Sequence, residues 1–369
     1  MIKLPEHIKN LTPYKAGKPI EELAREKGLT KIVKLASNEN PLGPSPLALK
    51  AIAENLTELH RYTDPKCYLL TKKLSQYYEV DQDRIIVASG SDAILQYIIS
   101  GVCEVGDEVI TSQGTFIGWY VNSDKYNIKC VKTLMDDFTY DLDAIYDAIN
   151  SKTKIIYLAN PNNPTGTIFT KHRFEEFLSK VPESILIVLD EAYTLYAREN
   201  PDYPDGLKYE KSNLMVLRTF SKDYGLAGLR IGAGFGDPQL IQSLYKVKLP
   251  FEPNMLAQTG AIAALGDVEF LKKTSLLNRW SLNRFREAFD EIGIKYTKSV
   301  GNFLMLIFPD EHTAIQFNDE CLNRGLILRH TGSFGVPVGV RINSGTEEET
   351  EFAINIITEV MNLIREEVK

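Results

Sequence analysis

The feature that most constrains the fold of this chain is a series of short, mostly apolar segments that alternate with helical segments between residues 85 and 235. These segments have the length of strands, and their alternation with helices is typical of βαβ units. We therefore predict an α/β fold with a large, mostly parallel sheet that helices cover on both faces. The predicted strands are Ile85–Ala88, Glu108–Thr111, Lys129–Leu134, Thr153–Ala159, Ile185–Leu189, Leu214–Phe220 and Ile231–Phe235.

A different pattern follows Pro253. A long helical stretch, Val268–Ile292, precedes a mixture of short strands and helices, which indicates a compact α+β unit. Its predicted elements are strands Lys295–Val300, Phe303–Phe308, Leu326–Arg329 and Val338–Ile342 and helices Thr313–Arg324 and Glu349–Glu367. Because 369 residues with 44% apolar content exceed what one core usually holds, we predict two domains. The large domain spans residues 55–250, and a smaller, discontinuous α+β domain with an N-terminal arm comprises residues 1–54 plus 251–369.

Charge and hydropathy exclude several classes of protein. A net charge of −7 argues against a nucleic-acid-binding surface. No stretch approaches the roughly 20 apolar residues of a membrane span. Glu6, His7 and Lys9 stand where a signal peptide would be apolar. We therefore expect a cytoplasmic protein that binds neither nucleic acid nor a membrane.

The residues that most often bind metals are scattered. The four cysteines, Cys67, Cys103, Cys130 and Cys321, show no metal-ligand spacing and are expected to be reduced. The five histidines have no pair at a spacing that would bind zinc from one helix face. We expect no metal site.

The segment from Thr219 to Arg230 carries the strongest chemical signal. Lys222 follows the predicted strand Leu214–Phe220, at the sheet edge where open α/β folds bind ligands. A lysine there can form a Schiff base with the aldehyde of pyridoxal phosphate (PLP), with Ser221 and Arg230 binding the phosphate. A lone lysine is more often a solvated surface charge, so other segments have to support this interpretation.

Asp190 ends another apolar run, Ile185–Leu189, which is typical of a buried parallel strand. A carboxylate there would keep the pyridine nitrogen of PLP protonated, so that the ring accepts electrons from the substrate Cα. The alternative is an ordinary N-cap aspartate at a strand end. Asn163 and Tyr193 would both donate hydrogen bonds to the phenolate oxygen of PLP, although Asn163 also fits a simple turn rich in proline.

Gly90 and Ser91 follow the strand Ile85–Ala88 and open a helical segment. Such a turn presents unpaired backbone N–H groups, which suit a phosphate dianion. Taken alone the signal is weak, because many helices begin with small polar residues.

Together these motifs carry a family resemblance. The order of Gly90-Ser91-Asp92, Asn163-Pro164-Thr165-Gly166, Asp190-Glu191-Ala192-Tyr193, Ser221-Lys222 and Arg230 resembles the fold-type I PLP-dependent aminotransferases over nearly the whole chain. Further segments resemble the histidinol-phosphate aminotransferase branch, whose members aminate imidazole-acetol phosphate in histidine biosynthesis. They are Asn10-Leu11-Thr12-Pro13-Tyr14, Lys34 to Gly43, His60-Arg61-Tyr62 and Val340-Arg341-Ile342.

The resemblance implies a homodimer and a role for each matching residue. Lys222 would bind the cofactor covalently and transfer the proton, Asp190 would pair with the pyridine nitrogen, and Asn163 and Tyr193 would bind the phenolate. The implied cofactor site also includes Gly90, Ser91, Asp92, Phe116 stacked on the ring, Ser221, Arg230, and Tyr62 reaching in from the other subunit. The implied substrate residues are Arg341 for the carboxylate of glutamate, Asn38 nearby, and Tyr14 and Arg329 for the phosphate of histidinol phosphate.

This chain departs from the family pattern at two places. Ala93 replaces the usual glutamate after Gly90-Ser91-Asp92, so any role of that glutamate is absent. Trp119 and Tyr120 closely follow Phe116, so the sequence leaves the identity of the stacking aromatic open by a residue or two.

Other functions remain as alternatives. An aromatic amino-acid aminotransferase is the nearest, because a pocket for glutamate and an imidazole ring also suits phenylpyruvate, and a phosphothreonine decarboxylase uses the same scaffold. A PLP-binding regulator is disfavoured by the lack of a helix-turn-helix pattern. The glycines of Gly232-Ala233-Gly234-Phe235-Gly236 resemble a dinucleotide-binding turn, but the third glycine is one position early.

Overall fold

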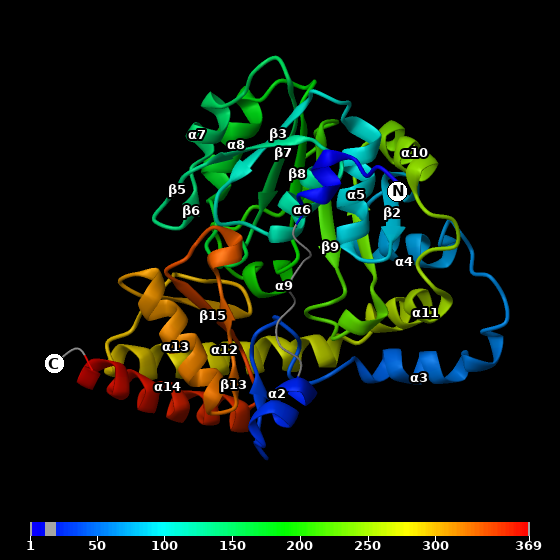
Figure 1. Ribbon diagram of the computed structural model, residues 1–369. Helices are drawn as coiled ribbons and strands as arrows, with labels where there is room; N and C mark the ends of the chain where they lie inside the picture. Colours follow the sequence, from blue (N-terminus) through cyan, green and yellow to red (C-terminus); the bar gives the residue numbers. More distant parts are fainter. Residues whose placement is uncertain (1, 12–19, 368–369) are drawn as a thin grey trace.

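The computed structural model describes residues 2–11 and 20–367, and a seven-stranded sheet forms its centre (Figure 1). The strands are β2 (Ile85–Ala88), β3 (Glu108–Ser112), β4 (Lys129–Thr133), β7 (Thr153–Ala159), β8 (Leu186–Asp190), β9 (Leu214–Thr219) and β10 (Gly232–Phe235). Their order is β2-β10-β9-β8-β7-β3-β4, and only β10 runs antiparallel to its neighbours. The prediction of a mostly parallel sheet is therefore confirmed.

Both faces of this sheet are buried, which explains the continuous apolar runs in the sequence. Alternate residues of β8 enter different cores: Ile187 and Leu189 lie in one apolar cluster, and Leu186 and Val188 lie in the other. Helices α5 (Ser91–Val102), α6 (Ile117–Lys125) and α10 (Pro238–Val247) contribute to the cluster on the Val188 face. Helices α3 (Pro46–Glu54), α4 (Tyr68–Tyr78), α7 (Leu142–Asp147), α8 (Lys171–Lys180), α9 (Thr194–Ala197) and α11 (Met255–Ala264) contribute to the other.

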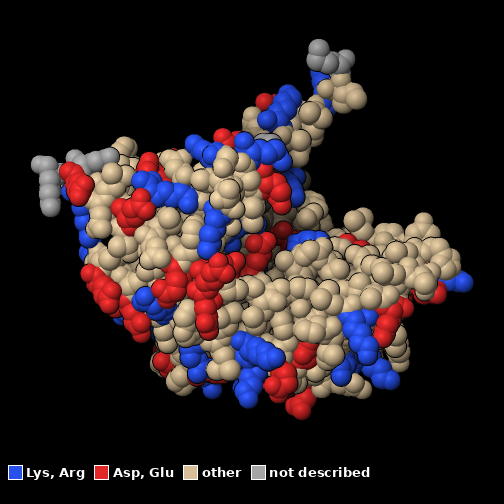
Figure 2. Space-filling model, turned by 90° about the horizontal axis from the view of Figure 1, so that it is seen from below, with Lys and Arg blue, Asp and Glu red and all other residues tan. Residues whose placement is uncertain are grey.

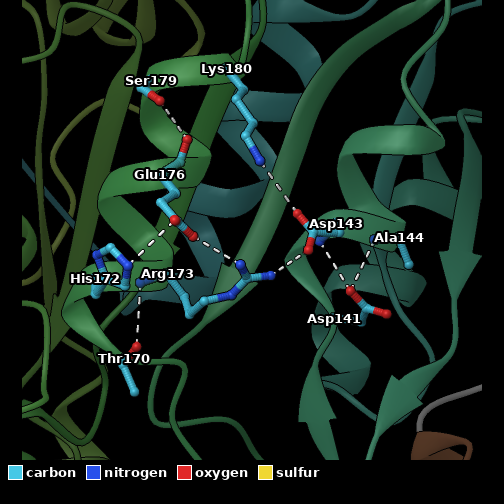
Figure 3. Close-up of polar contacts among 9 residues, drawn as sticks. All are labelled: Asp141, Asp143, Ala144, Thr170, His172, Arg173, Glu176, Ser179 and Lys180. Atoms are coloured by element: carbon cyan, nitrogen blue, oxygen red, sulfur yellow. Dashed lines mark hydrogen bonds and ion pairs between the residues drawn. The ribbon is translucent and has the colours of Figure 1, made fainter.

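Apolar burial, more than surface charge, attaches the outer helices. Figure 3 shows an ion network between α7 and α8, in which Asp143 contacts both Arg173 and Lys180 and Arg173 also contacts Glu176. The Arg173 guanidinium lowers the pKa of the Asp143 carboxyl. These side chains remain about half exposed, where ion pairs contribute little to stability. Beneath them, Phe174 is fully buried in the core.

The second part of the chain is a four-stranded antiparallel sheet with helices packed against it. Its strands follow the order β11 (Lys295–Tyr296), β12 (Phe303–Ile307), β15 (Gly339–Asn343) and β14 (Arg329–His330). Its core also takes side chains from α12 (Val268–Glu291), α13 (Glu311–Asn323) and α14 (Glu347–Glu367). The remaining elements are α1 (Glu6–Lys9), α2 (Ile20–Lys27), β1 (Val33–Lys34), β13 (Leu326–Ile327) and the hairpin β5 (Met135–Asp136) and β6 (Thr139–Tyr140).

The N-terminal segment joins this second part through β1, which pairs in parallel with β13. Val33 and Leu35 lie in the same core as β12 and β15. The predicted boundaries between the two domains remain a prediction. Ala48 and Ala257, which that prediction assigns to the smaller domain, pack in the core of the seven-stranded sheet.

Two predicted strands differ from the structure. The segment Leu326–Arg329 forms two short strands, because its first half pairs with β1 and its second half with β15. The segment Lys295–Val300 leaves its sheet after Tyr296, because Thr297 Oγ1 donates to Thr165 O at 2.5 Å and Val300 N donates to Gly166 O at 2.9 Å. These bonds attach the second part to the loop that follows β7.

Asp267 provides a test of how α3 and α12 are held together. Its carboxylate accepts hydrogen bonds from Ser45 Oγ at 2.6 Å, Leu47 N at 3.2 Å and Phe270 N at 3.3 Å, so it caps the first turns of both helices. We predict that Asp267→Ala lowers the free energy of unfolding by about 2 kcal/mol, since one helix cap contributes about 1 kcal/mol. Asp237→Ala, which removes the cap of α10 alone, serves as the control in urea denaturation. Equal losses in the two variants would contradict a double cap.

Candidate active site

Three neighbouring strands of the central sheet deliver polar side chains to one edge. Asp190 is the last residue of β8, Asn163 follows the end of β7, and Lys222 follows the end of β9. Because β7, β8 and β9 are parallel neighbours, their carboxyl ends meet at this edge.

Two adjoining cavities open there. The first, of about 140 Å³, is lined by Ser91, Asp92, Phe116, Ala159, Pro161, Asn163, Asp190, Ala192, Tyr193, Thr219, Ser221, Lys222, Ala227 and Arg230. The second, of about 120 Å³, is lined by Ala36, Ser37, Asn38, Phe116, Ile117, Asn163, Tyr193, Lys222, Arg329, Phe334 and Arg341. Phe116, Asn163, Tyr193 and Lys222 line both cavities, so a ligand in one lies next to a ligand in the other.

Most of the described residues selected from the sequence line one of these cavities, and two, Gly90 and Tyr62, do not. Gly90 lies beside the first cavity, where an added Cβ would stand 2.9 Å from Arg230 Nη2. Tyr62 lies away from both cavities with 85% of its surface exposed, and its ring stacks on Phe251 at 4.5 Å. Tyr14 lies outside the described residues.

The Lys222 amine is held in an environment that favours its neutral form. Its Nζ donates to Ser37 O at 3.3 Å. Burial lowers the pKa of Lys222 to about 8, and the positive charges of Arg341 and Arg230 add to this effect. Because the unprotonated amine is the nucleophile, a lowered pKa makes Lys222 reactive near neutral pH.

Asp190 is a buried acidic residue that lines the first cavity. Tyr157 Oη donates to its Oδ2 at 2.8 Å, and Ala192 N donates to its Oδ1 at 3.2 Å. Burial raises the pKa of Asp190 to about 6, while these hydrogen bonds oppose the rise. The carboxylate is therefore ionised at neutral pH and available to a cationic partner in the first cavity.

Polar side chains from the second part of the chain complete the site. Arg341 of β15 donates from Nη1 to Asn163 Oδ1 and from Nη2 to Ala36 O, the latter at 2.6 Å. Asn38 donates from Nδ2 to Tyr193 Oη at 2.8 Å, and burial raises the pKa of Tyr193 to about 12. Asn343 Oδ1 accepts from Asn38 N at 3.0 Å, which stabilises a left-handed backbone at Asn38.

Part of the lining of the first cavity suits an anion. Ser91 opens helix α5, where backbone N–H groups have no partner within the helix, and Ser221 and Arg230 line the same cavity. Asp92 also lines this cavity; burial raises its pKa, and Arg230 opposes the rise. Close packing requires Gly232 here, since an added Cβ would lie 2.4 Å from Ser91 N. Gly232 and Gly234 thus lie in β10, where close packing leaves no room for a side chain, and they do not form a dinucleotide-binding turn.

The aromatic residues at the start of α6, namely its N-cap Phe116 and the helical Trp119 and Tyr120, separate into two groups. Phe116 lines both cavities. Trp119 is fully buried and stacks on Tyr157 with ring centroids 4.7 Å apart, and Tyr120 Oη donates to Ser112 O inside the protein. Of the three, Phe116 is the one placed to face a ring in the first cavity.

Comparison with known proteins agrees with this geometry. Residues 30–357 match the family described as aminotransferase class I and II. This chain belongs to the class I and II aminotransferases. It is 40% identical over 358 residues to a histidinol-phosphate aminotransferase of Caldicellulosiruptor saccharolyticus, covering 96% of this chain and 99% of that one. Histidinol-phosphate aminotransferase 2 of Haemophilus influenzae is also 40% identical, with 96% of each chain covered.

Solved structures show the same fold. The histidinol-phosphate aminotransferase of Sinorhizobium meliloti, in complex with pyridoxal-5'-phosphate, superposes with a TM-score of 0.91 at 28% identity over 99% of both chains. An aspartate aminotransferase variant of Thermus thermophilus reaches 0.86 at 20% identity, which supports the fold alone. The resemblance deduced from the motifs is therefore confirmed.

This aminotransferase contains a buried ion network that the sequence analysis did not identify. Glu191 Oε2 accepts from Arg218 Nε at 3.1 Å and from Nη2 at 2.8 Å, and Arg218 Nη2 also donates to Asp205 Oδ1 at 2.7 Å. Gly206 N donates to Glu191 Oε1 at 2.6 Å. The available signal was Arg218 itself, because a charged residue inside an apolar strand requires a buried partner.

Several other residues that line the cavities were not predicted from the sequence. In the first cavity Thr219 accepts a hydrogen bond from Ser221 N at 3.2 Å and donates to Ser221 Oγ at 3.0 Å. In the second, Ser37 binds Lys222 through its carbonyl, and Ile117 and Phe334 supply apolar surface. Backbone and apolar contacts of this kind have no distinctive residue pattern.

Within residues 2–11 and 20–367, no helix is both long and apolar enough to cross a membrane, and no cluster of ligating side chains could hold a metal ion.

The ion network generates a stability prediction. We predict that Arg218→Met lowers the free energy of unfolding by about 3–5 kcal/mol, because it leaves the fully buried Glu191 carboxylate without its cation. Denaturant unfolding measures the loss. The double variant Arg218→Met/Glu191→Gln also removes the uncompensated charge of Glu191 and should recover part of the free energy of unfolding. A double variant less stable than Arg218→Met would show that an uncompensated charge is not the cause.

Proposed function

We propose that this aminotransferase uses PLP to transfer the amino group between L-histidinol phosphate and 2-oxoglutarate, forming imidazole-acetol phosphate and glutamate. The observation that carries the proposal is the pair of adjoining cavities that share Lys222, with Arg329 and Arg341 together in the second. The names of the 40% identical relatives support the same reaction.

The residues of the first cavity fit PLP. The lining of the cavity includes a carboxylate, Asp190, and three residues suited to an anion, Ser91, Ser221 and Arg230, so it matches a ring with a basic nitrogen and a phosphate. Phe116 would stack on the ring, and Asn163 and Tyr193 would bind its phenolate oxygen. When bound, PLP supplies an electron-accepting ring that stabilises the negative charge formed at the substrate Cα.

Asp190 and Lys222 would have different roles in the reaction. Asp190 would keep a positive charge on the ring nitrogen, because an ionised carboxylate favours a protonated neighbour. Lys222 would hold the cofactor covalently and, as a general base and acid, would move a proton to and from the substrate Cα. Its pKa of about 8 suits this role, because both protonation states are accessible near neutral pH.

The second cavity would hold the rest of the substrate. Arginine presents a planar fork that binds carboxylates and phosphates in pairs of hydrogen bonds. We assign Arg341 to the carboxylate of glutamate and Arg329, with Tyr14, to the phosphate of histidinol phosphate, with Asn38 beside them. Phe334 and Ile117 add apolar surface that also suits an aromatic side chain, so aromatic amino-acid transamination is the second candidate.

We also propose a cytoplasmic homodimer. Large apolar side chains near Tyr62 are exposed, among them Leu56, Leu59, Leu249 and Phe251. Figure 2 shows a broad band without Lys, Arg, Asp or Glu on the side of the molecule where α3 lies. A dimer interface would cover such a surface and bring Tyr62 of the partner subunit to the cofactor phosphate. Free cysteines at all four positions support a reducing compartment.

Covalent attachment of the cofactor tests Lys222. We predict that borohydride reduction of the PLP-loaded protein fixes the cofactor on the Lys222 peptide, detected by mass spectrometry. In cofactor-free protein, the rate of attachment should rise with pH up to about 8 and then level off, because the amine reacts only when unprotonated. Lys222→Ala should lose at least about 10² in kcat.

Lys248 is the matched control for this experiment. Burial lowers its pKa as well, but it lies outside both cavities and donates to Pro65 O at 3.2 Å. Lys248→Met should retain attachment at Lys222. A reduced adduct on any other lysine would refute the assignment.

Donor selectivity tests the two arginines of the second cavity. We predict that Arg329→Ala lowers kcat/KM for histidinol phosphate roughly tenfold to a hundredfold, since a charged hydrogen bond contributes about 1.5–3 kcal/mol. The half-reaction with phenylalanine, which has no phosphate, should be spared. Arg341→Gln, which can still donate a hydrogen bond toward Asn163, should instead impair glutamate and spare histidinol phosphate. Equal damage to both donors by Arg329→Ala would favour the aromatic aminotransferase.

A further inference from the structure

The carboxylate of Asp190 receives a side-chain hydrogen bond from a neighbouring strand. Tyr157 Oη donates to Asp190 Oδ2 at 2.8 Å. In the register of β7 and β8, Ala159 pairs with Asp190 and Tyr157 pairs with Val188. Residues two apart on a strand share a face, so Tyr157 and Asp190 lie on the same face as diagonal neighbours. The Tyr157 side chain is long enough for its hydroxyl to contact the Asp190 carboxylate.

Packing fixes the orientation of the tyrosine ring. Tyr157 and Trp119 are both fully buried, and their rings stack with centroids 4.7 Å apart and planes 9° apart. Trp119 belongs to α6, the helix whose N-cap residue, Phe116, lines both cavities. A close-packed ring has little freedom to rotate, so the hydroxyl stays directed at Asp190.

We propose that Tyr157 is a positioning residue of this aminotransferase, whose hydroxyl and stacked ring hold the Asp190 carboxylate in its orientation toward the first cavity. The proposal rests on the proposed function, in which Asp190 pairs with the cofactor nitrogen. Tyr157 occupies one oxygen and Ala192 N, at 3.2 Å, occupies the other. Each oxygen keeps a further lone pair for a cationic partner. Tyr157 itself does not line either cavity, so it acts through Asp190.

The hydrogen bond from Tyr157 is one of several interactions that set the pKa of Asp190. Burial and the nearby Asp92 both raise the pKa of Asp190, whereas Lys222 and the Tyr157 hydrogen bond lower it. A donor that binds the charged form stabilises that form. Without Tyr157, the balance would shift toward a protonated Asp190 that no longer carries the charge needed by its partner.

Tyr157→Phe tests the proposal, with Tyr120→Phe as the matched control. Tyr120 belongs to the same apolar cluster, and its hydroxyl donates to Ser112 O at 2.7 Å, with no contact to Asp190. In the full-length cofactor-free protein, carboxyl ¹³C NMR with Asp190→Asn for assignment should show the Asp190 pKa raised by roughly 1 to 2 pH units in Tyr157→Phe. Tyr120→Phe should leave it unchanged.

The PLP-loaded enzyme gives two further readouts. In Tyr157→Phe, the pH at which the bound cofactor changes its visible absorbance should move upward, because a less positive ring withdraws fewer electrons. The value of kcat should fall about tenfold while KM stays within about twofold, because Tyr157 touches no substrate. Failure of the wild-type protein to bind PLP would overturn the proposed function, whereas the NMR titration would still test Tyr157.

An unchanged Asp190 pKa in Tyr157→Phe would overturn the positioning role. Equal shifts in Tyr157→Phe and Tyr120→Phe would overturn it as well, because they would indicate general loosening of the core. A rise in KM with unchanged kcat would assign Tyr157 to substrate binding and reject the proposal.

Discussion

The structure of the site depends on one buried ion network, formed by Glu191, Arg218 and Asp205. Charges in a protein interior are costly unless each has a partner, so this network fixes the relative position of the strands that carry it. Glu191 directly follows Asp190 at the end of β8, and Arg218 precedes the segment from Thr219 to Lys222 at the end of β9. The network therefore connects two of the chain segments that line the first cavity, those at the ends of β8 and β9.

Because side chains alternate along a strand, Asp190 and its neighbour Glu191 have different partners. Successive side chains point to opposite faces, so Asp190 faces the cavity while its neighbour Glu191 binds Arg218. The same alternation places Tyr157 beside Asp190. At this edge of the sheet, the side chains on one face line the cavity. Those on the other face form the ion pair between Glu191 and Arg218.

The second cavity depends on how the two sheets meet. Arg341 comes from the antiparallel sheet and contacts Asn163 of the loop after β7, and Asn38 contacts Tyr193. Thr297 and Val300 bind the backbone of that same loop. Substrate specificity would therefore respond to the packing between the two sheets, even where the substituted residue touches no ligand.

The sequence by itself determined the elements and the chemistry that depend on local pattern. Short, mostly apolar segments alternating with helices predicted the strands of the central sheet, and two-sided burial explains the continuous apolar runs of inner strands such as β8. The edge strand β4 is only partly buried and has no such run. Position after a strand selected Asp190 and Lys222, because the carboxyl ends of parallel strands share one edge. Family motifs added further residues of the cavities, including Phe116, Asn38 and Arg341.

Only the tertiary structure decided which side chains meet across elements. It placed Phe116 at the cavities and Trp119 against Tyr157, a choice that the sequence, with three aromatic residues within five positions, left open. It paired Arg218 with Glu191, and it split the segment from Leu326 to His330 between two sheets. Periodicity reports how much of a residue is buried, but the partner of a buried group is set by packing between segments far apart in the chain.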